Sequence, residues 1–139
     1  MNSGANTIHL EWSCPATVQN VEQVCSAAIG EVGTAALFHK DRFAAEILIR
    51  EALNNAFLHG CKQNPLLAFA CSLDISARGI VITVSDEGAG FEWRRQSELP
   101  ANPLSESGRG LRIYAVYAHT IQYNDTGNRV VLTRYFTQG

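Results

Sequence analysis

Apolar and polar residues alternate along several short stretches of the chain, which is the period of a strand with one buried face. Residues 7–12 alternate in this way, and Pro15 is expected to end that strand. The run 66–76 and residues 80–85 are two further predicted strands, and the short turn between them, 77–79, indicates an antiparallel hairpin. This part of the chain therefore predicts three strands.

The C-terminal residues predict a second hairpin. A short strand is expected near 120–123, and a turn at 125–128 leads into a last strand over 129–136. Because side chains alternate across a strand, Thr133 and its odd-numbered neighbours are expected on one face and Leu132 with its even-numbered neighbours on the other. Hairpins thus join most of the predicted strands.

Apolar residues at helical spacing predict two helices in the first half of the chain. The first begins after Thr17, a suitable N-cap, and is expected to end at Gly33. The second and longer helix takes Asp41 as its candidate cap, places Phe43 on its apolar side and is expected to end at Gly60. Each helix would turn one apolar face toward a core.

A third helix is predicted after a long polar loop. Residues 92–106 show no apolar period and contain Pro100 and Pro103, and loops of this length tend to be functional, so this one is a candidate lid. The segment 108–110 then opens the third helix. Because so few helices cannot cover both faces of a sheet, we predict an α+β two-layer sandwich, with about three helices on one face of a mixed, mostly antiparallel sheet.

Composition favours one folded domain and disfavours several kinds of partner. The 139 residues are 46% hydrophobic with a net charge of −2, so they can bury a core, and residues 1–139 are expected to form a single domain. With 11 basic and 13 acidic residues, the chain has no strong field to attract nucleic acid or a membrane. It has neither a leader-like start nor a run of about 20 apolar residues, so a cytoplasmic protein is expected.

The four cysteines give no sign of a disulfide or a metal site. Cys14, Cys25, Cys61 and Cys71 form no C-x-x-C pair and have no zinc-like spacing with histidines. We therefore expect buried free thiols.

A polar stripe is predicted on the second helix. Glu51, Asn55 and His59 are each four residues apart, so their side chains share one face. A carboxylate one turn before an amide oxygen would suit a general base beside a Mg²⁺ ligand. A solvated helix face is the alternative, and for such a stripe taken alone it is the more common case.

A glycine-containing turn follows one of the predicted strands. Asp86 ends that strand, and Gly88 and Gly90 permit close approach of the backbone to a ligand. The carboxylate could accept a hydrogen bond from an amino group such as that of adenine. An ordinary turn after a strand explains the same residues equally well.

A second glycine-containing segment, 108–110, leads into the third helix. The free amides and the dipole of a helix N-terminus can hold a phosphate, and the fork of Arg109 matches phosphate geometry. The alternative is a loop hinge without a ligand, with Ser107 as a plain N-cap.

Three motifs follow one another along the chain: the polar stripe of the second helix, the glycine-containing turn after Asp86 and the segment 108–110. Together they resemble the N, G1 and G2 boxes of the GHKL ATPase superfamily, whose members share the Bergerat ATP-binding fold. The resemblance covers residues 41–135, and the segment 59–65 is similar to that of the small anti-sigma-factor serine/threonine kinases. The chain offers no separate helix with a phospho-accepting histidine, so a sensor histidine kinase is not expected.

The resemblance implies a role for each motif residue. Asn55 would hold Mg²⁺, and Asp86 would accept a hydrogen bond from the adenine amino group. Glu51 would be the catalytic base that deprotonates a serine or threonine hydroxyl. Thr133, on the last strand, matches a family position near the adenine.

The glycines and Arg109 would bind the rest of the nucleotide by the same resemblance. Gly88 and Gly90 would let the chain pass close to ATP. Gly108, Arg109 and Gly110 would contact the phosphates.

The resemblance implies an ATP-dependent protein serine/threonine kinase that is also an anti-sigma factor in a partner-switching system. Such a protein binds either a sigma factor or another regulator, or an antagonist protein that it phosphorylates. A homodimer formed through residues 7–12 and their neighbours is also implied.

The alternative is a nucleotide-gated binding module that sequesters a sigma factor or other regulator with little kinase activity. A pure sequestering protein would need Asn55 and Asp86 for the nucleotide but no base, so the presence of Glu51 favours the kinase.

Overall fold

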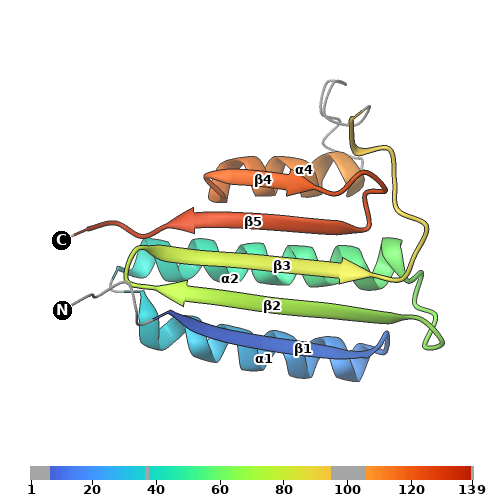
Figure 1. The fold of residues 1–139 in the computed structure, drawn as a ribbon, viewed down its shortest axis with the longest axis horizontal. Coiled ribbons are helices and arrows are strands. Elements are labelled where there is room, and N and C mark those ends of the chain that lie inside the picture. The colour runs from blue at the N-terminus through green and yellow to red at the C-terminus, as the bar shows by residue number, and fades with distance from the viewer. Residues whose placement is uncertain (1–6, 37, 95–105, 139) are drawn as a thin grey trace.

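The computed structural model describes residues 7–36, 38–94 and 106–138, and its centre is one five-stranded sheet (Figure 1). The strand order is β1-β2-β3-β5-β4, and all four pairings are antiparallel. The strands are β1 (Ile8–Pro15), β2 (Ala68–Ser76), β3 (Gly79–Asp86), β4 (Thr120–Tyr123) and β5 (Arg129–Tyr135). Both predicted hairpins are confirmed, and the sheet, which was expected to be mixed and mostly antiparallel, is fully antiparallel in the described residues.

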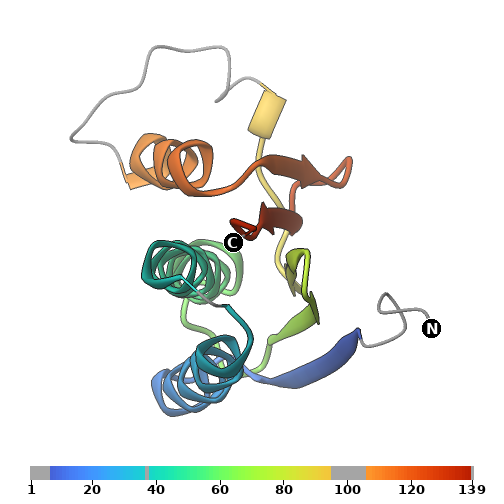
Figure 2. The ribbon, with the colours of Figure 1, turned by 90° about the vertical axis from the view of Figure 1, so that its left-hand side faces the viewer.

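The long helices lie on one face of the sheet (Figure 2). They are α1 (Val18–Ala35), α2 (His39–Asn55), which continues into a π-helical turn, η2 (Ala56–Gly60), and α4 (Glu106–Tyr117). This arrangement confirms the predicted α+β two-layer sandwich.

Helix α1 begins as predicted and ends later than predicted. The Thr17 hydroxyl accepts a hydrogen bond from the backbone N–H of Asn20 at 3.1 Å, which is an N-cap contact. The helix continues past Gly33 to Ala35. Glycine weakens a helix interior without forbidding it, so the expected stop at Gly33 was wrong.

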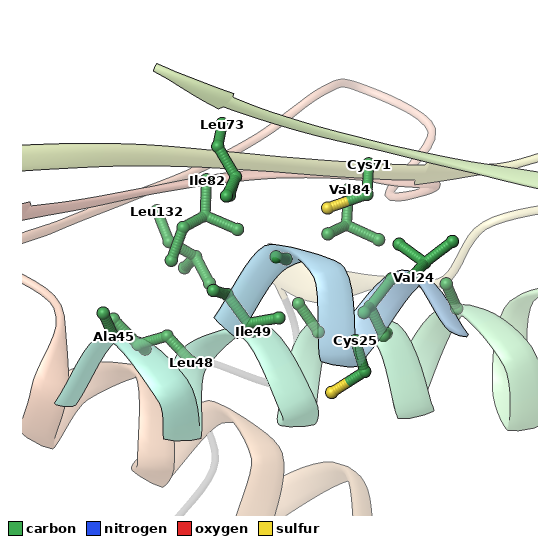
Figure 3. Close-up of a cluster of buried hydrophobic side chains, with 14 of the residues drawn as sticks. Val24, Cys25, Ala45, Leu48, Ile49, Cys71, Leu73, Ile82, Val84 and Leu132 are labelled. Atoms are coloured by element: carbon green, nitrogen blue, oxygen red, sulfur yellow. The ribbon is translucent and has the colours of Figure 1, made fainter. Parts of the chain in front are cut away.

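The two layers meet in an apolar core between the sheet and helices α1 and α2 (Figure 3). Leu48 and Ile49 of α2 are fully buried against inward side chains of the central strands, among them Leu73, Ile82 and Leu132. The alternation predicted for the last strand is therefore correct, because Leu132 faces this core and its odd-numbered neighbours face away. All four cysteines are free thiols, and Cys25, Cys61 and Cys71 are buried.

Helix α2 differs from the prediction at its start. It begins at His39, with Phe38 as the residue before it, so Asp41 is not the cap. Phe43, expected on the apolar side, is 47% exposed, because the buried face follows Ala44, Ala45 and Leu48.

Asp41 instead forms a buried ion pair across the molecule. Its side chain is fully buried, and its Oδ1 accepts hydrogen bonds from the Arg134 guanidinium, the shortest at 2.9 Å. Its Oδ2 accepts from the backbone N–H of Thr137 at 2.8 Å. Arg134 also donates to the carbonyl of Tyr117 at the end of α4, at 3.0 Å. The pair thus joins α2, α4 and β5 at one point.

Replacing Asp41 with alanine should strongly destabilise the fold. Asp41→Ala leaves the Arg134 guanidinium and the Thr137 N–H buried without their acceptor, and we expect a loss of about 3 kcal/mol in the free energy of unfolding, measured with urea. Asp125→Ala is the matched control, because Asp125 pairs with Arg94 but is itself fully exposed to solvent, and it should change stability little. Similar effects of the two substitutions would contradict the role of the buried pair.

The same pair predicts a dependence of stability on pH. Burial opposes ionisation of Asp41, but the Thr137 N–H and the Arg134 guanidinium outweigh it and hold the pKa of the carboxyl below its ordinary 3.8. The ionised form is the one that the fold stabilises, so this stabilisation is present above pH 3.8 and is lost as the pH falls through the lower folded value. The stability difference between wild type and Asp41→Ala should therefore shrink in that acidic range.

Candidate functional site

A cavity of about 280 Å³ lies between the end of α2, η2, α4 and the adjoining strands. It is lined mainly by apolar atoms with a few polar groups, which is typical of a small-molecule site. The lining residues are Ala52, Asn55, Ala56, His59, Gly60, Val84, Asp86, Gly90, Phe91, Tyr114, Tyr123, Gly127, Asn128, Arg129 and Val130.

The turn η2 brings the end of α2 into the cavity wall. Residues 56–60 wind as a π-helix, in which the N–H of Cys61 bonds to the carbonyl of Ala56 at 2.7 Å. Such single turns often occur at functional sites. Lys62 and Gln63 follow with positive φ values of 52° and 60°, and they turn the chain toward β2. His59 and Gly60 thereby line the cavity.

Asp86 lies at the end of β3 and lines the cavity. Among the described lining residues it is the one with a carboxylate. Its Oδ1 accepts a hydrogen bond from the N–H of Gly88 at 2.8 Å. Burial raises the pKa of Asp86 above its ordinary value, and the Gly88 N–H offsets part of this increase. The cavity therefore contains a half-buried carboxylate with one oxygen partly satisfied by the chain.

Two glycines make the position of Asp86 sterically tight. A Cβ on Gly60 would lie 2.2 Å from Oδ2 of Asp86, and a Cβ on Gly88 would lie 2.0 Å from the carbonyl oxygen of Gly60. Gly90 has a φ of 83°, and a Cβ there would lie 1.9 Å from the carbonyl oxygen of Thr126. The sequence predicted that these glycines would let the backbone come close to a ligand. In the structure they let it come close to other parts of the chain, and Gly90 also lines the cavity.

The side-chain amide nitrogen of Asn55 faces α4. Its Nδ2 donates a hydrogen bond to the Tyr114 hydroxyl at 3.0 Å, so its other polar atom is Oδ1, an oxygen of the kind that Mg²⁺ prefers. In the part of the chain that the structure describes, no group of three or more His, Cys, Asp or Glu could hold a metal ion. Asn55 therefore fits a Mg²⁺ that takes its remaining ligands from phosphate and water.

Glu51 lies one turn before Asn55 and is half-buried. It is not among the lining residues of the cavity, whereas Asn55 and His59 of the same predicted stripe are. Two of the three residues of the predicted stripe therefore line the cavity, and Glu51 does not.

Thr133 does not lie where the resemblance implied. It is on the sheet face away from the helices, beside Thr120 of β4 and Val81 of β3, and it is not in the cavity lining. The residues of β5 that line the cavity are Arg129 and Val130, at the other end of the strand. The expectation for Thr133 is therefore corrected.

The hairpin before β5 supplies the residue that the sequence analysis missed. Asn128 lines the cavity beside Asp86, and its Nδ2 donates to the carbonyl of Gly88 at 3.3 Å. The turn at 125–128 was predicted, but its nearness to Asp86 depends on β5 pairing with β3, which no local pattern shows. Asn128 is therefore identified by the pairing of β5 with β3 and not by a sequence motif.

An aromatic wall was also missed. The rings of Phe91 and Tyr123 meet edge to face at 5.4 Å, and Trp93 stacks on Tyr123 at 5.4 Å. The Trp93 indole N–H donates to the carbonyl of Asn124 at 2.9 Å. These contacts connect the segment after Asp86 to β4 and close one side of the cavity.

The remaining predicted residues fall at the start of α4. This helix begins at Glu106, so Gly108, Arg109 and Gly110 lie within its first turns, and the prediction that they open the helix was late by two residues. Most of the predicted lid, 95–105, lies outside the described residues.

The family model of the histidine kinase-like ATPase domain matches residues 14–134. This span contains every predicted site residue from Glu51 to Thr133. No curated protein matches the chain at a significant level. Each helix in the described residues is too short or too polar to cross a membrane.

A Cβ at Gly60 should disturb the site, whereas a Cβ on α1 should not. Gly60→Ala places a methyl group against the Asp86 carboxyl, and we expect a loss of about 1–3 kcal/mol in stability and a changed Asp86 pKa by NMR. Gly33→Ala is the control, because nothing lies within 4 Å of its new Cβ. It should stabilise the helix by about 0.5–1 kcal/mol. A neutral Gly60→Ala would show that the contact with Asp86 is dispensable.

Proposed function

The chain belongs to the histidine kinase-like ATPase domain family, and from this we propose that it is an ATP-dependent protein serine/threonine kinase and anti-sigma factor in a partner-switching system. Family membership supports ATP binding and kinase-type chemistry in general. The single observation that carries the proposal is that Asn55 and Asp86, from separate elements, line one cavity.

The adenine of ATP would occupy the part of the cavity beside Asp86. The carboxylate would accept a hydrogen bond from the amino group, while Val84 and Val130 offer apolar surface to the ring. Asn128 fixes the carbonyl of Gly88 on the same side. Gly88 and Gly90 let the chain pack tightly beside Asp86, on the side where the adenine would bind.

The phosphates would extend toward α4. The N-terminal part of α4, which contains Gly108, Arg109 and Gly110, would bind them, because a helix N-terminus attracts anions. Asn55 would hold Mg²⁺ through Oδ1. When bound, Mg²⁺ neutralises charge on the phosphates.

Glu51 would act as the general base. It lies one turn before Asn55, so a serine or threonine hydroxyl bound at its carboxylate would be near the terminal phosphate. Glu51 would take the hydroxyl proton as the γ-phosphoryl group moves to the oxygen. Most of the rate enhancement would come from positioning.

The phosphorylated partner would be a small antagonist protein, and the sequestered partner a sigma factor or another regulator. A homodimer through β1 is part of the proposal, and the position of β1 at one edge of the described sheet supports it. The four free cysteines suit a cytoplasmic protein.

Replacing Asp86 with asparagine should weaken ATP binding itself. Asp86→Asn removes a charged acceptor, so we expect a Kd for ATP at least about tenfold higher by isothermal titration calorimetry. The raised pKa of Asp86 adds a pH effect, because binding needs the ionised carboxylate and should weaken as the pH falls toward that pKa. Asp74→Asn, on the outer face of β2, is the control. An unchanged Kd would place the adenine elsewhere.

Replacing Glu51 with glutamine should separate binding from transfer. Glu51→Gln should keep the Kd for ATP within about twofold but reduce transfer of labelled phosphate to an antagonist protein by at least about a hundredfold. Glu46→Gln, on the same helix and outside the cavity lining, should transfer normally. Full transfer by Glu51→Gln would exclude it as the base. Tight ATP binding by wild type with no transfer would favour the nucleotide-gated binding module.

A further inference from the structure

We propose that Tyr114 is a positioning residue for Asn55, and that its hydroxyl holds the side-chain amide so that Oδ1 faces a Mg²⁺ bound with ATP. The inference rests on the proposed function, because it concerns the cation of the same cavity. It adds a residue of α4 to the machinery that the sequence motifs indicate.

The hydrogen bond between these two side chains joins two elements that are far apart in the sequence. The Tyr114 hydroxyl accepts from Nδ2 of Asn55 at 3.0 Å, and the Tyr114 side chain, at 2% exposure, has little freedom to move away. Asn55 comes from the end of α2, and Tyr114 lies in the middle of α4. The contact therefore fixes the end of one helix against the other.

The chemistry of the amide explains why this contact matters for a cation. An asparagine side chain has one oxygen and one nitrogen, and only the oxygen can bind Mg²⁺. When the oxygen faces the cation, the N–H groups point away from it and need an acceptor in a poorly solvated place. The Tyr114 hydroxyl oxygen is that acceptor in the described structure.

The phenol is suited to this role because its hydroxyl oxygen can accept a hydrogen bond from the Asn55 amide. Tyr114 lines the cavity together with Asn55, so this acceptor lies in the wall where the cation would bind.

Substituting Tyr114 by phenylalanine tests the proposal with metal binding as the readout. Tyr114→Phe removes only the hydroxyl, and partners that orient a metal ligand are typically worth about 10–100-fold in metal affinity. With Mn²⁺ as the probe and a non-hydrolysable ATP analogue at saturation, electron paramagnetic resonance should show at least about tenfold weaker Mn²⁺ binding by the variant. Nucleotide affinity measured in EDTA should stay within about twofold, because the adenine contacts are unchanged.

Tyr117→Phe is the matched control. Tyr117 lies on the same helix one turn later and is not in the cavity lining, so the loss of its hydroxyl should leave Mn²⁺ affinity unchanged. Equal Mn²⁺ affinity of Tyr114→Phe and wild type would overturn the inference. A Tyr114→Phe loss of nucleotide affinity that is the same with and without metal would also overturn it, since it would show a structural role.

NMR of the wild-type chain gives a test that does not depend on a variant. The Asn55 side-chain N–H₂ signals, assigned by their loss in Asn55→Ala, should exchange more slowly with water when Mg²⁺ and the ATP analogue are bound. Unprotected signals in that complex would contradict the proposal. Failure of the wild-type chain to bind the ATP analogue at all would instead contradict the proposed function, so the two failures are distinguishable.

Discussion

The buried ion pair between Asp41 and Arg134 is the constraint on which the arrangement of the layers depends. It joins the first turn of α2 to the end of β5, and through the carbonyl of Tyr117 it also holds the end of α4. The cavity lies at the opposite end of α2, about 20 Å away along the helix axis. The two helices are therefore fixed to the sheet at one end, and at the other end they are separated enough to admit a ligand between them.

The parts of the fold that follow from local patterns were predictable. The alternation along the strands, the two hairpins and the Thr17 cap depend on neighbouring residues alone, and all agree with the structure. Asp41 looked like a cap because aspartate often occupies that position, but its true partners are more than ninety residues later in the chain. A contact of that kind cannot be read from a window of neighbouring residues.

The candidate site also has a part that local patterns predicted and a part that depends on contacts between distant residues. The sequence placed Asn55 within a predicted helix and Asp86 at the end of a predicted strand, and both residues line the cavity. Thr133 and Asn128 show the opposite case, because only the pairing of β5 with β3 decides which position of that hairpin is beside Asp86. Tyr114 carries no motif signal, since an aromatic residue on an amphipathic helix is most often part of a core.

The π-turn at residues 56–60 amounts to one extra residue carried inside a helix. The extra residue shifts the following side chains of this turn by about 100° around its axis, so a regular helical wheel misplaces His59 relative to Asn55, although both line the cavity. For anyone who aligns or redesigns this segment, its length matters as much as its composition. Removing a single residue here would make the helix regular, and it would turn Gly60 away from the one carboxylate that requires a glycine beside it.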